Sequence, residues 1–192
     1  PGDSCRLMLV NLTSFVTKPW KKEATFNFGH FAAVVQKAQR LMDDMVDLEI
    51  EQIEKILQKI ENDPEPPGVK QIEKDLWLNI ETQARLGRRT GLGVTGVGDA
   101  IAMLGQIYGS EESIKTTEEI YKWLAINSYE SSITMAKERG AFPVWDLEKE
   151  KNHEFLSRII NELIPDKVDE YKDYGRRNIA NTTTAPAGSV SC

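Results

Sequence analysis

Hydrophobic positions along the first third of the chain follow first a strand pattern and then a helical one. Residues 5–16 are apolar on both alternating sets, which predicts a strand that is buried on both faces. Over residues 28–46 the apolar positions recur every three or four residues, which predicts an amphipathic helix with Asn27 as its N-cap. A second helical set covers 50–60, and the proline-rich run 62–68 ends it, because proline cannot continue a helix.

The rest of the chain is also predominantly helical. An amphipathic stretch over 69–86 leads to a glycine-rich segment, where we expect a short extended piece that enters a helix at 97–104. The longest helical pattern covers 111–139, with Gly140 as its C-cap. Two shorter helices and a β-prone segment are predicted at 155–163, 168–174 and 178–184. A strand, several helices and a further strand indicate a helix-rich α/β fold, either a barrel or an open sheet.

Composition excludes several classes of protein. The 192 residues are 40% hydrophobic and 28% charged, which is typical of a globular chain and not of a disordered or collagen-like one. No apolar run approaches the roughly 20 residues of a membrane span, and no signal peptide is visible at the start, so we expect no membrane partner. The formal net charge of −6 argues against a nucleic-acid partner, which would need a basic surface.

The cysteines and histidines are too few and too far apart for a metal site. Cys5 and Cys192 lie at opposite ends of the chain, and His30 and His153 are widely separated. No pair has the spacing of a zinc motif, so we expect no metal. Two cysteines also make no disulfide framework, which indicates a reducing, cytoplasmic compartment where thiol chemistry is transient and catalytic.

Two short patterns have both a structural and a chemical interpretation. Cys5 could be a small buried core residue, which is the commoner role of a free cysteine. Near the C-terminus, a glycine-bearing turn could join two elements or hold a phosphate through its backbone N–H groups. Gly188 would allow close approach of an anion, and Ser189 would add a hydroxyl donor. The residues of this turn are Pro186, Ala187, Gly188, Ser189 and Val190.

Glycine and arginine clusters are interpreted structurally. The spacing of Gly91, Gly93, Gly96 and Gly98 is similar to a dinucleotide-binding loop, but no clear strand precedes it and no acidic residue follows at the required distance. Close packing against neighbouring segments is therefore the favoured interpretation. The pairs Arg88-Arg89 and Arg176-Arg177 are expected to be solvated or ion-paired at the surface.

Five motifs, taken in order, resemble one known family. They are DSCRLMLVNLTSFV, DPEPPGVKQIEKDLWLNI, GRRTGLGVTGVGDAIAMLG, AKERGAFPVWDLEKEKN and YGRRNIANTTTAPAGSVS. Each alone is weak evidence, but together they resemble the catalytic barrel of ribonucleotide reductase. The closest form is the adenosylcobalamin-dependent class II enzyme. The resemblance covers essentially the whole chain.

The resemblance implies a fold and a place within a longer enzyme. Family members are several times longer and have a ten-stranded α/β barrel, with the radical-bearing cysteine on a loop just upstream of the first strand seen here. Residues 1–192 would then be a single, helix-rich piece of the barrel domain, incomplete at both ends. Adenosylcobalamin would be bound mainly by segments outside this chain.

The resemblance also implies an activity. A ribonucleotide reductase converts ribonucleotides to deoxyribonucleotides for DNA synthesis by thiyl-radical chemistry, and a cysteine pair is the reductant. Cys5 matches one cysteine of that pair, whose partner lies on an earlier strand. The segment 186–190 matches the loop that holds the substrate phosphates, with Ala187 in place of the commoner threonine. The implied partners are the ribonucleotide, the remaining segments of the reductase and a thioredoxin-type reductant, and the isolated chain would be inactive.

Alternatives stay open at this point. A class I catalytic subunit has the same barrel and phosphate loop but takes its radical from a separate subunit. The chain could also be a non-catalytic nucleotide-binding or scaffold piece, or an unrelated helix-rich α/β protein. The choice between diphosphate and triphosphate substrates is not determined. The central expectation is that the Cys5 thiol and the Gly188 backbone meet at one ribose.

Overall fold

The computed structural model describes residues 2–185. Its strands are β1 (Arg6–Asn11), β2 (Val16–Thr17), β3 (Thr25–Phe26) and β4 (Thr90–Thr95). The long helices are α1 (Phe28–Asn62), α2 (Pro67–Gly87) and α4 (Glu111–Arg139). The short helices are α3 (Val97–Met103), α5 (Leu147–Glu150), α6 (Glu154–Ser157) and α7 (Val168–Tyr174). Single-turn segments are η1 (Leu12–Phe15), η2 (Arg158–Leu163) and η3 (Pro165–Lys167).

A parallel pair of strands, β1 and β4, forms a two-stranded sheet. β1 and β4 pair in register from Arg6 opposite Thr90 to Asn11 opposite Thr95, and α1 and α2 form the crossover between them. On the other side of β4, Thr182 makes a parallel bridge to Leu92. Residues 2–185 show no closed barrel, so the expected ten-stranded barrel is not confirmed. The predicted helix-rich α/β fold agrees with the observed helices and parallel strands.

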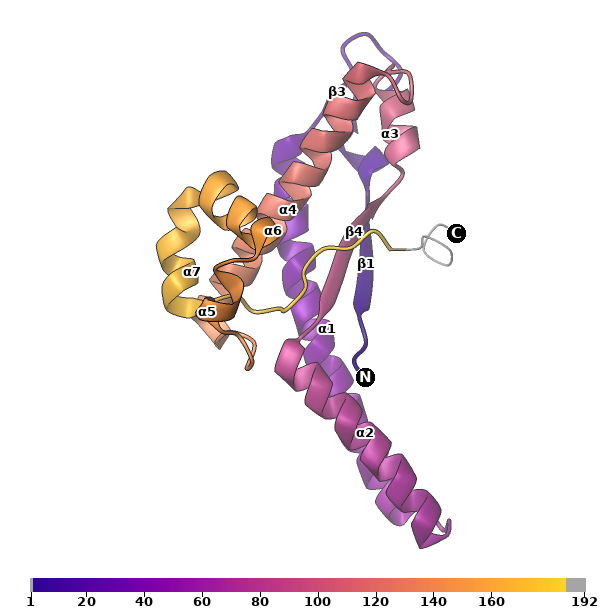
Figure 1. The fold of residues 1–192 in the computed structure, drawn as a ribbon. Coiled ribbons are helices and arrows are strands. Elements are labelled where there is room, and N and C mark those ends of the chain that lie inside the picture. The colour runs from indigo at the N-terminus through magenta and orange to yellow at the C-terminus, as the bar shows by residue number, and fades with distance from the viewer. Residues whose placement is uncertain (1, 186–192) are drawn as a thin grey trace.

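Three long helices give the molecule its elongated shape (Figure 1). The first half of α1 packs beside α4, and its second half continues away from the sheet with α2 alongside. The main core lies where α1, α4, η1 and the two central strands meet. Its fully or almost fully buried apolar side chains include Leu12, Phe15, Phe31, Val35, Met42, Leu92, Ala100 and Ile120.

The structure corrects two boundaries near the start of the chain. The expected strand 5–16 ends at Asn11, whose side-chain oxygen accepts hydrogen bonds from the Thr13 backbone N–H at 3.1 Å and the Thr13 hydroxyl at 2.8 Å. These contacts turn the chain into η1. The helical sets 28–46 and 50–60 are one continuous helix, α1, because no proline or glycine separates them.

Other local predictions are confirmed. Asn27 caps α1 by accepting a hydrogen bond from the His30 backbone N–H at 3.0 Å. The helix α4 has the predicted bounds, and Gly140 ends it with φ of 85°. The predicted extended piece is β4, which leads into α3. Within the described residues, no helix is both long and apolar enough to cross a bilayer.

The region between α4 and the last segment forms a small lobe. Here α6, η2 and α7 pack on α4 around a second core that includes Tyr129 and Ile133. Gly175 ends α7 with φ of 73°, and a Cβ at this position would lie 2.6 Å from Cδ2 of Trp145. Both the backbone conformation and the contact with the indole ring therefore require glycine.

We predict that Gly175→Ala lowers the free energy of unfolding of the chain by about 2 kcal/mol, because the left-handed backbone and the indole contact both oppose a methyl group. Chemical denaturation measures this change. Gly98→Ala is the matched control, since Gly98 lies in α3, is exposed and has no atom within 4 Å of the added Cβ. It should leave stability unchanged or raise it, and equal losses in the two variants would contradict the prediction.

Candidate functional site

The Cys5 thiol lies against the glycines of β4. A Cβ added to Gly91 would lie 2.9 Å from the Cys5 Sγ and 2.9 Å from Cγ2 of Thr183, with Leu7 also in contact. A Cβ on Gly93 would lie 2.7 Å from the Thr183 carbonyl oxygen. The absence of side chains on these glycines thus allows residues from three segments to meet on one face of the sheet.

This geometry explains the glycine-rich motif. Gly91 and Gly93 lie inside β4, and Thr183, next to the residue that bridges to Leu92, contacts both glycine positions. Three backbone hydrogen bonds hold that segment to β4, the shortest being 2.7 Å from the Leu92 N–H to the Asn181 carbonyl. Close packing, and not a dinucleotide loop, is therefore the role of these two glycines, as the sequence favoured.

Cys5 is a free, exposed thiol at the residue before β1. Partial burial against the sheet raises the pKa of the thiol above its ordinary value, while the guanidinium groups of Arg89 and Arg6 act in the opposite direction. The net effect keeps the thiol protonated near neutral pH.

The predicted phosphate segment, Pro186–Val190, and Cys192 lie outside the described residues. The described chain leads to that segment through Thr183, which lies on the same face as Cys5. The convergence of the Cys5 thiol with the Gly188 backbone stays a prediction.

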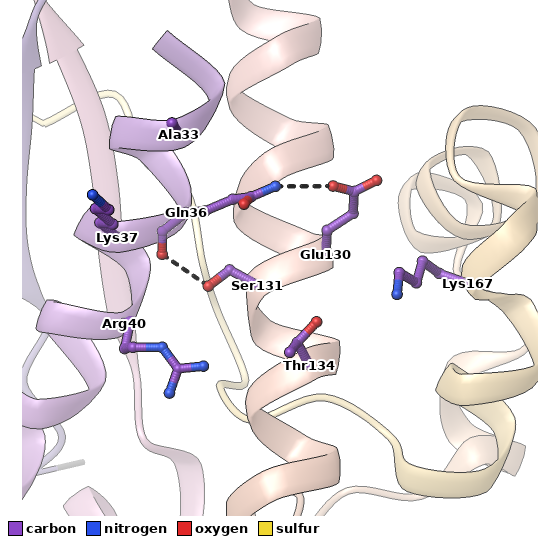
Figure 2. Close-up of a pocket in the computed structure, with 8 residues that line it drawn as sticks. All are labelled: Ala33, Gln36, Lys37, Arg40, Glu130, Ser131, Thr134 and Lys167. Carbon is purple, nitrogen blue, oxygen red and sulfur yellow. Dashed lines mark hydrogen bonds between the residues drawn. The ribbon is translucent and has the colours of Figure 1, made fainter. Parts of the chain in front are cut away.

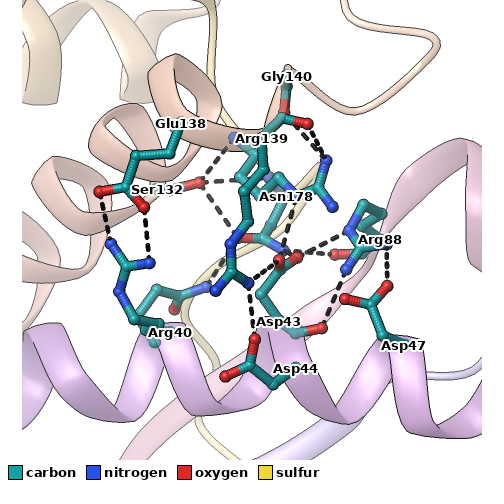
Figure 3. Close-up of polar contacts among 12 residues, drawn as sticks. Arg40, Asp43, Asp44, Asp47, Arg88, Ser132, Glu138, Arg139, Gly140 and Asn178 are labelled. Atoms are coloured by element: carbon teal, nitrogen blue, oxygen red, sulfur yellow. Dashed lines mark hydrogen bonds and ion pairs between the residues drawn. The ribbon is translucent and has the colours of Figure 1, made fainter.

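Behind the sheet, a buried carboxylate on α1 joins four parts of the fold (Figure 3). The side chain of Asp43 is fully buried, and each of its oxygens accepts two hydrogen bonds. One oxygen binds Arg88 Nε at 2.8 Å and Asn178 Nδ2 at 2.9 Å, and the other binds Arg177 Nε at 3.1 Å and Arg139 Nη1 at 3.4 Å. Complete pairing of this kind is what allows a charge to be buried.

Asn178 extends this network to α4 and to the sheet. Its side-chain oxygen accepts from Gln39 Nε2 at 3.0 Å and from the Ser132 hydroxyl at 3.2 Å. Its amide nitrogen also donates to the Arg88 carbonyl oxygen at 3.0 Å. Asn178 is fully buried, so the chain that precedes Thr183 is fixed by side chains of α1 and α4.

The arginine pairs are placed differently from the prediction. Arg88 and Arg176 are buried, with 6% and 4% of their surface exposed, so the expected surface position is wrong for both. The expected ion pairing is correct, because Arg88 binds Asp43, and Arg176 binds Glu150 in the small lobe. Burial of the arginines follows from the carboxylates that α1 and α5 place beside them.

The sequence contained a signal for this network. Gln39 and Asp43 lie at the same helical phase as the buried Val35, Met42 and Val46, so polar side chains face the core.

Desolvation alone would raise the pKa of the Asp43 carboxyl, but the hydrogen bonds and charges of Arg88 and Arg177 outweigh it and hold the pKa below the ordinary value. The carboxylate is therefore ionised in the folded chain at neutral pH.

A cavity of about 480 Å³ lies between α1, α4 and η3 and away from Cys5 (Figure 2). Its lining residues are Ala33, Gln36, Lys37, Arg40, Glu130, Ser131, Thr134 and Lys167. Two of its cationic side chains already form ion pairs: Arg40 pairs with Glu138, and Lys167 pairs with Glu170. The cavity thus belongs to the helical layer and not to the face that carries Cys5.

We predict that Asp43→Asn lowers the free energy of unfolding at neutral pH by about 3–5 kcal/mol. The change removes the carboxylate that pairs with Arg177 and the buried one of the two carboxylates that pair with Arg88. Since the folded pKa lies below the unfolded value of about 3.9, the stabilisation is present above that pH and is lost as the pH falls through the folded pKa. Urea unfolding at several pH values should show the difference between wild type and variant shrinking in acid.

Asp44→Asn is the control for this measurement. Asp44 is the next residue of α1, is 46% exposed and pairs with Arg139 at 2.6 Å. An exposed pair contributes about 0–1 kcal/mol, so the control should change stability little. A loss at Asp44 as large as that at Asp43 would show that burial is not the cause.

Comparison of the sequence with known proteins identifies the family of this chain. The chain matches the family described as ribonucleotide reductase, barrel domain, over residues 2–192. It is 27% identical to the vitamin B12-dependent ribonucleoside-diphosphate reductase of Thermoplasma acidophilum, over 100% of this chain and 19% of that protein. Reductases of the same name from two strains of Mycobacterium tuberculosis, CDC 1551 and H37Rv, are 24% identical over 100% of this chain and 20% of their length. The chain therefore spans about a fifth of the length of these curated relatives, and it belongs to the barrel-domain family of ribonucleotide reductases.

Proposed function

We propose that this chain is part of the catalytic barrel of a vitamin B12-dependent ribonucleoside-diphosphate reductase and that Cys5 is one of its two reducing thiols. The observation that carries the proposal is the position of the thiol. Its sulfur lies over Gly91, beside the segment that leads to residues 186–190. The names of the relatives favour the B12-dependent enzyme over a class I subunit, and favour a diphosphate substrate.

The proposed chemistry needs two electrons. Replacement of the ribose 2′-hydroxyl by hydrogen releases one water, and two thiols supply the electrons and protons as they become one disulfide. Cys5 would be one thiol, and its partner would come from a segment outside this chain. A thioredoxin-type dithiol would then reduce the disulfide, which returns both cysteines to the reduced state.

Residues 186–190 would hold the substrate phosphates. Backbone N–H groups at a glycine-bearing turn are suited to an anion, and the hydroxyl of Ser189 would add a donor. Because Thr183 is held to β4 by backbone hydrogen bonds, the chain enters this turn from a fixed position beside Cys5. The phosphates and the thiol would then act on the same nucleotide.

Cobalamin would be held mainly by other segments of the reductase, where it supplies the radical that activates the ribose. The two imidazoles of this chain are engaged elsewhere. His30 packs edgewise on Phe15 with ring centroids 5.1 Å apart, and the His153 side chain caps α6. Neither is placed to ligate cobalt next to Cys5.

Cys5→Ser in the full-length reductase should reduce dithiol-supported multiple turnover to background, because the serine hydroxyl cannot form a disulfide. Deoxyribonucleoside diphosphate formed per enzyme, with adenosylcobalamin and a dithiol present, is the measurement. Cys192→Ser is the matched control, since this second cysteine is not expected to be a redox residue, and it should retain turnover. Unchanged turnover in Cys5→Ser would refute the role proposed for this thiol.

The chain by itself should form no deoxynucleotide with adenosylcobalamin and dithiol, because the radical cysteine and the second reducing thiol are expected on other segments. Mixing it with the flanking segments of the reductase should restore product formation if the pieces assemble. Product from the chain alone would contradict the proposal. Assembly without any activity would favour a scaffold role instead.

A further inference from the structure

One carboxylate on α1 binds the residues on both sides of Cys5. The Ser4 hydroxyl donates to Glu49 Oε1 at 3.0 Å, and Arg6 Nε donates to Glu49 Oε2. Arg6 has only 7% of its surface exposed, so its ion pair with Glu49 is largely shielded from solvent. The chain before and after the cysteine is thereby anchored to the same side chain.

A second set of contacts fixes this region to the start of β4. Arg89 Nε donates to Asp3 Oδ2 at 2.7 Å, and Arg6 Nη1 donates to the carbonyl oxygens of Ser4 at 3.1 Å and Arg89 at 3.3 Å. The buried Nη2 atom of Arg6 has no hydrogen-bond partner among the described residues. Glu49 is the carboxylate that hydrogen-bonds Arg6, and Asp3 adds a longer ion pair at 3.9 Å.

These contacts determine where the thiol lies. Successive side chains of an extended segment point to opposite faces, so anchoring Arg6 toward α1 directs Cys5 to the other face. There its Sγ contacts the position of Gly91 and lies close to Thr183. Fixed neighbours thus hold a side chain that is otherwise exposed.

We propose that Glu49 is a positioning residue for the Cys5 thiol: it binds Ser4 and Arg6 so that the sulfur stays against Gly91. Its importance for ribose reduction rests on the proposed function, because a reducing thiol must stay within reach of the sugar. The positioning itself is a property of this chain and can be tested without turnover.

The charged groups around Cys5 predict the effect of removing the carboxylate. Arg6 and Arg89 lower the pKa of the thiol, whereas burial and Asp3 raise it. Glu49→Gln would leave Arg6 with only its longer, 3.9 Å ion pair to Asp3 and would weaken the contacts that hold Ser4 and Arg6 to α1. The thiol would therefore become more exposed and more acidic. Both changes increase its rate of alkylation.

The test is alkylation of Cys5 by iodoacetamide across the titration range of the thiol. All variants of the chain carry Cys192→Ser, so that Cys5 is the only cysteine. Glu49→Gln should alkylate about 3–10-fold faster near neutral pH, with the midpoint of the pH–rate profile shifted to lower pH. Glu51→Gln, an exposed carboxylate two residues along α1, is the control and should match the reference.

An unchanged rate and midpoint in Glu49→Gln, or an equal change in Glu51→Gln, would overturn the proposal. If Glu49→Gln shows no cooperative melting, Ser4→Ala decides, because it removes only one exposed hydroxyl contact. A faster alkylation rate in Ser4→Ala supports the positioning role of Glu49, and an unchanged rate overturns it. The alkylation result is independent of turnover. A failure of the redox role of Cys5 can therefore be distinguished from a failure of the positioning role of Glu49.

Discussion

The arrangement of the sheet depends on the buried, ionised carboxylate of Asp43. It binds Arg88 just before β4, and it binds Arg177 and Asn178 just before the segment that bridges to Leu92. A buried charge is tolerated only when its hydrogen bonds are complete, so these partners must all be in place together. One side chain of α1 therefore determines how two neighbouring parts of the sheet lie against the helices.

The two faces of the sheet have different physical roles as a result. The face toward α1 and α4 contains the polar network and the main core, which hold the strands in place. On the other face, Gly91 and Gly93 leave room where Cys5 and Thr183 approach each other. The helices thus support one face of the sheet, while on the other face the glycines allow the thiol and the Thr183 segment to pack closely.

Near Cys5, buried or partly buried arginines are again paired with carboxylates. Glu49 compensates the charge of the buried Arg6, while Asp3 compensates Arg89. The guanidinium groups are thus held close to the thiol without making it a permanent thiolate, since burial raises its pKa more than the arginines lower it. The structure therefore holds a protonated thiol at a defined place on the sheet.

The sequence by itself determined the local elements and, through five ordered motifs, the family. Caps such as Asn27 and Gly140, and the prolines after residue 62, act within a few residues, so they can be recognised without coordinates. Only the tertiary structure decided the rest, because Asp43 and Asn178 are 135 residues apart. Which arginine is buried, and that Thr183 reaches Cys5 over Gly91, follow from how the helices and strands pack, which no local pattern contains.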